Sequence, residues 1–253
     1  MDLVLLVLLV AGFTAQGYIA LKMRERFRFI DRQFDTVNRR FTWHEKKNEN
    51  DKLEIQNISA LSALKLNWPL FFGGWSVDGF MCRFLLQYLM ENRPKNIVEL
   101  GSGSSTILIS RCLEILKEDT SFHVAIDHEN RYLQQTQEQA RLNGLEDRIT
   151  FLECPLERYE AFDKLWYGGV IDKLKGEKID LLIIDGPPGP LQSHSRYPAV
   201  PLLYELLAPH CTIVLDDAGR PDEREIVKQW VEEFPDFEMS LYPEGHGIAV
   251  LSR

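Results

Sequence analysis

The sequence predicts an α/β fold: a doubly wound, mostly parallel seven-stranded sheet with helices on both faces, preceded by an N-terminal transmembrane helix. Three observations support this. From residue 95 onward, short β-type runs alternate with helix-compatible stretches, as is typical of a parallel sheet covered by helices. Residues 97–117 read as an apolar strand, a glycine loop and a helix, and residues 3–21 form one uncharged apolar run. The 253 residues, 45% of them hydrophobic, suffice for one domain with an appendage.

Residues 1–22 predict a membrane anchor. The apolar run is about 19 residues long, enough to cross a bilayer as a helix. A cleaved signal peptide is the alternative, but it would carry basic residues before the run, where only Met1 and Asp2 stand. The positive-inside tendency predicts a single-pass protein whose chain after residue 22 lies in the cytoplasm. The basic residues that indicate this orientation follow the run: Lys22, Arg24, Arg26 and Arg28.

Residues 23–60 predict an amphipathic helical stalk and a linker. Apolar side chains recur there at steps of three or four residues: Phe27, Ile30, Phe34, Val37 and Phe41. One expectation is that the stalk packs against its own domain or against a second copy, which would give a homodimer. The alternative is a basic helix that lies on anionic lipid. Residues 61–93 predict a helical cap, with Ser76 capping a helix that continues through Leu89.

The composition excludes a basic nucleic-acid-binding surface, because the net charge is −9. No nucleic-acid partner is therefore expected. The cysteines show no CxxC spacing and no nearby histidine pattern, so buried thiols are expected rather than a disulfide framework or a zinc site. They are Cys82, Cys112, Cys154 and Cys211.

The last domain, residues 94–253, is expected to place its ligand at one rim of the sheet. Seven strands are predicted, at residues 96–100, 122–127, 149–153, 179–185, 212–216, 237–241 and 248–251. Ligands of doubly wound sheets lie at the carboxyl ends of the strands. Acids stand at several of these ends and predict an acidic crevice for a hydroxyl-rich or cationic ligand: Glu99, Asp127, Glu153, Asp185, Asp216 and Asp217.

The glycine loop further restricts the class of ligand that is expected at this rim. Gly101 and Gly103 are followed by Thr106 where a dinucleotide fingerprint has its third glycine, and the G-K-[ST] of a P-loop is absent. Glu99 would repel a pyrophosphate but favours an ammonium or sulfonium group. Asp127 stands where it can accept hydrogen bonds from two ribose hydroxyls.

These motifs resemble those of the class I S-adenosylmethionine-dependent methyltransferases, whose fold is Rossmann-like. The resemblance covers residues 68–253. Within that superfamily, Asp-Gly-Pro-Pro-Gly at 185–189 is similar to a bacterial-type branch whose substrates are largely unassigned. The matching segments are Ile97-Val-Glu-Leu-Gly-Ser-Gly-Ser-Ser-Thr106, Val124-Ala-Ile-Asp127 and Asp180-Leu-Leu-Ile-Ile-Asp185.

The resemblance implies a set of residues that bind S-adenosylmethionine. The glycine loop would lie against the methionine part, with Glu99 near its ammonium, and the serines after the loop would cap the next helix or touch the carboxylate. Asp127 would bind the ribose, and His128 would lie beside the adenine. The implied set is Glu99, Gly101, Ser102, Gly103, Ser105, Asp127, His128, Glu153, Cys154 and Asp185.

The resemblance also implies an acceptor site. In relatives that resemble catechol O-methyltransferase, Mg²⁺ is held by acids after the fourth and fifth strands, and the matching oxygen donors here are Asp185, Asp216 and Asp217. The alternative for Asp217 is a helix cap or an ion pair with Arg220. The base that takes the acceptor's proton would be Asp185, Asp216 or His194, or a metal would lower the acceptor's pKa.

The expected function is therefore a membrane-anchored S-adenosylmethionine-dependent methyltransferase with its catalytic domain in the cytoplasm. The acceptor is expected to be a hydroxyl of a small molecule, a sugar or a lipid-linked intermediate. Two alternatives remain: an aminopropyl transferase on the same fold, and a non-catalytic scaffold at the membrane.

Overall fold

The computed structural model describes residues 22–25, 28, 32, 35, 39, 47–72, 76–118, 121–176 and 178–253. The chain divides into two compact units, Met1–Lys52 and Leu53–Arg253. In the first unit, every described residue is helical. The predicted membrane helix and the apolar positions of the predicted stalk lie outside the described residues. Where the structure describes helices, none is long and apolar enough to span a bilayer.

The second unit is built on the predicted seven-stranded sheet. Its strand order is β3-β2-β1-β6-β7-β9-β8. The first five strands in that order run parallel, whereas β9 lies antiparallel to both β7 and β8. The strands are β1 (Asn96–Leu100), β2 (Phe122–Asp127), β3 (Thr150–Glu153), β6 (Ile179–Ile184), β7 (Leu207–Leu215), β8 (Glu238–Tyr242) and β9 (Ile248–Ser252).

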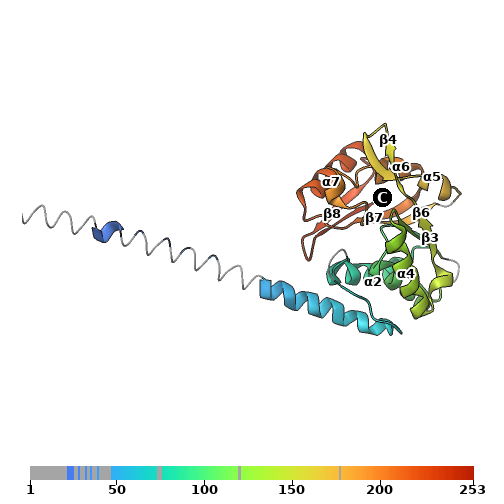
Figure 1. Cartoon of the computed structure of the whole chain (residues 1–253), viewed down its shortest axis with the longest axis horizontal. Helices are drawn as coiled ribbons and strands as arrows, with labels where there is room; N and C mark the ends of the chain where they lie inside the picture. Colours follow the sequence, from blue (N-terminus) through green and yellow to red (C-terminus); the bar gives the residue numbers. More distant parts are fainter. Residues whose placement is uncertain are drawn as a thin grey trace, which may run out of the picture. The chain divides into compact units, whose positions relative to one another are not determined.

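Helices cover both faces of this sheet, as predicted (Figure 1). Alternate strand residues point to opposite faces. Ile97 and Leu181 therefore pack with α2 and α3, whereas Val98 and Leu182 pack with α5, α6 and α7. The helices are α2 (Gly79–Asn92), α3 (Ser104–Leu116), α4 (Asn130–Asn143), α5 (Val170–Lys173), α6 (Ala199–Leu203) and α7 (Pro221–Glu233), with 3₁₀ turns at η1 (Leu61–Leu64), η2 (Glu146–Arg148), η3 (Gly189–Leu191) and η4 (Tyr204–Leu206).

Two local features differ from the sequence-based expectation. The segment between β3 and β6 forms an antiparallel hairpin of β4 (Leu156–Tyr159) and β5 (Lys164–Tyr167), which was not predicted. Helix α2 begins at Gly79, and its N-cap is Asp78, whose Oδ1 accepts from the Met81 N–H at 2.8 Å. The Ser76 hydroxyl instead donates to the Ser104 hydroxyl at 3.1 Å, so Ser76 is not the cap.

The point where the strand order reverses positions the site. The chain runs outward from β1 to β3 and then returns to β6 on the other side of β1. In register, Leu100 pairs with Ile184, and Ile184 pairs with Leu215. The residues that follow these strands therefore meet at one edge of the sheet, where ligands of doubly wound folds bind.

Candidate functional site

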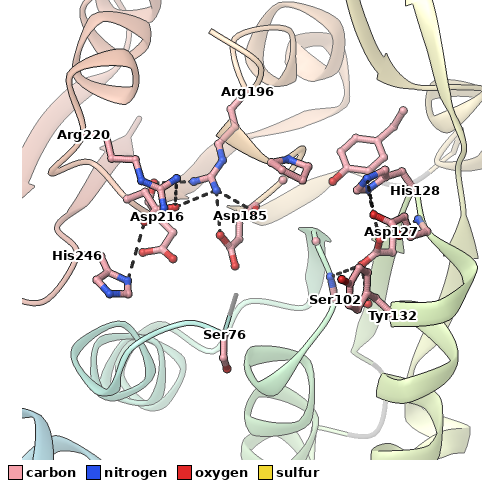
Figure 2. Close-up of a pocket in the computed structure, with 16 residues that line it drawn as sticks. Ser76, Ser102, Asp127, His128, Tyr132, Asp185, Arg196, Asp216, Arg220 and His246 are labelled. Atoms are coloured by element: carbon pink, nitrogen blue, oxygen red, sulfur yellow. Dashed lines mark hydrogen bonds and ion pairs between the residues drawn. The ribbon is translucent and has the colours of Figure 1, made fainter. Parts of the chain in front are cut away.

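A pocket lies at this edge, outside the carboxyl ends of β1, β2, β6 and β7. Figure 2 shows Asp127, His128 and Ser102 on one side of it, and Arg196, Arg220 and Asp216 on the other. The lining combines the strand-end acids with aromatic and basic side chains: Ser76, Gly101, Ser102, Asp127, His128, Glu129, Tyr132, Tyr167, Asp185, Gly186, Pro188, Arg196, Asp216, Asp217, Arg220 and His246.

The glycine loop leaves bare backbone at the pocket wall. Gly101 has φ +104°, and a Cβ there would lie 3.3 Å from the carbonyl carbon of Asp185, so a side chain would be strained and crowded. Gly103 precedes α3, and its N–H donates to Thr106 Oγ1 at 3.1 Å. Thr106, which stands in place of a third glycine and is fully buried, thus accepts a hydrogen bond from one of the free N–H groups at the start of α3.

Asp127 at the end of β2 is held by the loop. Its Oδ2 accepts from the Ser102 N–H at 3.2 Å and from the Ser102 hydroxyl at 2.9 Å, and its Oδ1 accepts from the Glu129 N–H at 3.0 Å. Burial alone would raise the pKa of Asp127, but hydrogen bonds from His128, Glu129 and Ser102 outweigh it and hold the pKa below its ordinary value. Asp127 is therefore a fixed carboxylate that faces the pocket.

Tyr167 at the end of β5 places an unpartnered hydroxyl in the pocket wall. This side chain is fully buried, and its Oη has no hydrogen-bond partner among the described residues. Tyr167 lies edge-on to His128, with ring centroids 6.2 Å apart. A Cβ on Gly186 would collide with the Tyr167 hydroxyl, so glycine at this position allows the tyrosine to enter the pocket wall. An unpaired buried donor beside a pocket fits a polar ligand.

Arg196 organises the opposite end of the pocket. This buried guanidinium donates from Nη2 to Asp185 Oδ1 at 3.1 Å and to Asp217 Oδ2 at 3.0 Å. Its Nη1 donates to the backbone carbonyl of Asp216 at 2.9 Å. Arg220 Nη1 also lies 2.9 Å from Asp217 Oδ2, which confirms the ion-pair alternative for Asp217.

Asp216 is the candidate base at this end. Its Oδ1 is buried and accepts no hydrogen bond within the described part of the chain. Burial and the charge of Asp217 raise the pKa of Asp216 to about 6, although Arg196 opposes the shift. Burial, followed by the charge of Asp216, also raises the pKa of Asp185 well above its ordinary value. A carboxyl that titrates near 6 is suited to accept a proton at neutral pH.

The three acids expected to hold Mg²⁺ do not converge on one point. The group whose ligand atoms lie within 4.8 Å of one another comprises Asp216, Asp217 and His246. Asp185 instead pairs with Arg196. The place between Asp185 and Asp217 already holds the positive charge of a guanidinium, so these residues do not fit the expected metal site.

Several predicted site residues lie outside the pocket lining. Glu99 is 1% exposed, and its Oε2 lies 2.9 Å from His123 Nε2, because its side chain points into the sheet's core. His194 Nε2 lies 3.0 Å from Glu225 Oε2, and His194 is not among the lining residues. The other predicted residues outside the lining are Gly103, Ser105, Glu153 and Cys154.

Those four residues have local structural partners or buried positions. Glu153 hydrogen-bonds to Asn130 on α4, and the Cys154 thiol lies 3.5 Å from Lys173 Nζ. Ser105 is buried in the first turn of α3. The predicted cofactor residues that do line the pocket are Gly101, Ser102, Asp127, His128 and Asp185.

Residues 98–218 match the model of a family described as a methyltransferase domain. A comparison with curated protein sequences gives no match.

Solved structures share the fold. A methyltransferase from Geobacter sulfurreducens is 21% identical with a TM-score of 0.54, and the match covers 71% of this chain and 81% of that chain. An O-methyltransferase from Bacillus cereus in complex with SAH is 16% identical with a TM-score of 0.54, covering 79% and 90%. An SAH-bound methyltransferase from Podospora anserina is 16% identical with a TM-score of 0.55, covering 78% and 86%.

Proposed function

We propose, from the premise that this chain contains a class I S-adenosylmethionine-dependent methyltransferase domain, that it transfers a methyl group to a hydroxyl of a small-molecule, sugar or lipid-linked acceptor. One observation carries the proposal. One pocket, at the point where the strand order reverses, is lined by both Asp127 and Asp216. Hydrogen bonds hold the pKa of Asp127 below its ordinary value, whereas burial raises the pKa of Asp216.

The residues at the Asp127 end fit the cofactor. Gly101 and Ser102 present backbone without a bulky side chain, and Asp127 can exchange its contacts with Ser102 for ribose hydroxyls. Tyr167 offers its unpaired hydroxyl in the same wall. When bound, S-adenosylmethionine supplies an electrophilic methyl carbon, which exchanges its bond to sulfur for one to the acceptor oxygen while sulfur keeps the electron pair.

The residues at the other end fit an acceptor hydroxyl. The Asp216 carboxylate, which lines the pocket, would take the hydroxyl proton and so increase the nucleophilicity of the acceptor oxygen. Arg196 holds the backbone carbonyl of Asp216 and the carboxylates of Asp185 and Asp217, so the acids keep their positions while the acceptor binds.

The membrane anchor is part of the proposal. Residues 1–22 would hold the domain at the cytoplasmic face of a membrane and bring it close to lipid-linked acceptors. A variant that lacks residues 1–22 should then lose turnover on acceptors embedded in vesicles and keep turnover on soluble analogues. Equal activity of the two forms on vesicle-embedded acceptors would contradict the anchoring.

Calorimetry with S-adenosylmethionine and S-adenosylhomocysteine tests the cofactor, and transfer of labelled methyl to cell extracts tests the reaction. We expect both molecules to bind and the label to enter a small-molecule or lipid fraction. Binding of neither would contradict the proposal and favour a ligand such as the decarboxylated cofactor of an aminopropyl transferase. Tight binding without any transfer would favour the non-catalytic scaffold.

A further inference from the structure

We infer that Arg196 supplies the positive charge expected from Mg²⁺ at the acceptor end, so that this protein works without a bound divalent cation. The inference rests on the proposed methyl transfer. Its first ground is the burial of Arg196, which is 2% exposed and lies among the ends of β6 and β7. A guanidinium cannot lose its charge there, because its pKa lies far above any physiological pH.

The hydrogen bonds of Arg196 fix it in place. Besides its two carboxylate contacts, it donates to three backbone carbonyls: Asp185 O at 3.1 Å, Asp216 O at 2.9 Å and Pro187 O at 3.4 Å. Backbone carbonyls do not move with side-chain rotamers. Swinging the guanidinium out to admit a metal ion would leave these carbonyls without this donor, which is costly at a buried position.

A metal ion and this guanidinium would compete for the same oxygens. Arg196 Nη2 bridges Asp185 Oδ1 and Asp217 Oδ2, two of the three carboxylates expected to bind Mg²⁺. Arg220 makes a second ion pair with the same Asp217 oxygen. A divalent ion placed between these carboxylates would lie beside a buried positive charge, and the repulsion opposes binding.

The remaining candidate ligands form a weaker set. His246, the third member of the group with Asp216 and Asp217, is 55% exposed at its side chain. Its Nδ1 lies 3.9 Å from Asp217 Oδ1 and equally far from Asp78 Oδ2. A metal site made by these three residues is therefore the competing outcome, and His246→Ala identifies it.

The experiment titrates the full-length protein with MgCl₂ and CaCl₂ by calorimetry, and measures methyl transfer after dialysis against EDTA. We expect no saturable heat at millimolar metal and unchanged turnover in EDTA. Saturable binding, with turnover lost in EDTA and restored by Mg²⁺, would overturn the inference. Loss of that binding in His246→Ala would then assign the metal to Asp216, Asp217 and His246.

A variant sharpens the result. Arg196→Met removes the positive charge between Asp185 and Asp217 and frees both carboxylates, so the affinity of the variant for Ca²⁺ should rise by about tenfold or more. Arg141→Met, which removes an exposed arginine on α4, is the matched control and should not change metal affinity. No gain of metal affinity in a folded Arg196→Met would contradict the inference. If that variant does not fold, the measurements on the unaltered protein decide.

The two proposals fail in different ways. Absence of S-adenosylhomocysteine binding would contradict the methyltransferase function but leave the metal titrations informative. Binding and turnover that both depend on Mg²⁺ would support the function and contradict the role of Arg196.

Discussion

The carboxylate of Asp127 accepts two hydrogen bonds from one residue, Ser102, through its backbone N–H at 3.2 Å and its hydroxyl at 2.9 Å. The pair joins the end of β2 to the glycine loop after β1. The contact holds the acid in the pocket wall before any ligand binds, which reduces the ordering cost of binding.

Asp127→Ala should therefore abolish cofactor binding. The loss of charge-assisted hydrogen bonds predicts an affinity for S-adenosylhomocysteine at least about 100-fold weaker by calorimetry. Glu138→Gln is the control, since it removes an exposed acid of α4 that pairs with Arg141. An affinity for Asp127→Ala within a few-fold of the unaltered protein would contradict the role of Asp127.

Asp185→Ala should separate binding from transfer. Asp185 lines the acceptor end and is held by Arg196, so the variant should bind S-adenosylhomocysteine normally and lose methyl transfer. Full turnover would show that the acceptor site is assigned to the wrong residues.

The pH dependence of transfer should follow Asp216. Its pKa is raised to about 6, and a base must be deprotonated to act, so kcat/KM should rise as pH increases through about 6 and level off above it. Asp216→Asn should remove both the transfer and this rise. A profile that stays flat from pH 5 to pH 8, measured at saturating cofactor, would contradict the assignment.

The same carboxyl should make the protein less stable at neutral pH. The pKa of Asp216 is raised in the folded protein, so between about pH 4 and 6 the folded protein keeps a proton that the unfolded chain has lost. The contribution of Asp216 to the free energy of unfolding therefore falls as pH rises through that window. Asp216→Asn should thus raise the urea midpoint at neutral pH, and the gain should shrink below the pKa. An equal or lower midpoint at neutral pH would count against the shifted pKa.

Tyr167→Phe should weaken the binding of the cofactor without destabilising the protein. Its hydroxyl has no partner to lose in the folded chain, so the urea midpoint should not fall. A lost ligand hydrogen bond predicts an affinity for S-adenosylhomocysteine about tenfold weaker. Tyr204→Phe, whose hydroxyl donates to Asp236 away from the pocket, is the control. Unchanged affinity in Tyr167→Phe would exclude a ligand contact.

The sequence alone determined the sheet and the glycine loop, because both follow from local patterns. Apolar runs that end in turn signals define each strand, and strands that are apolar on both sides require helices on both faces of the sheet. The loop needs glycine at Gly101 whatever surrounds the domain, since φ +104° disfavours side chains. The strand-end pattern also indicated that acids meet at one rim of the sheet. The pocket there is lined by Asp127, which ends β2, and by Asp185 and Asp216, which follow β6 and β7.

The tertiary structure decided which acids face the ligand and what neutralises them. Glu99 lies one residue before the end of β1, so the alternation of side chains turns it into the core against His123, whereas Asp185 and Asp216 come just after their strands and turn into the pocket. Tyr167 enters the site from a hairpin whose strands, Leu-Glu-Arg-Tyr and Lys-Leu-Trp-Tyr, are only four residues long and show no regular alternation in the sequence. Arg196 lies between carboxylates that are 11 and 21 residues away in sequence, and only the packing of β6 against β7 brings them within reach of one guanidinium.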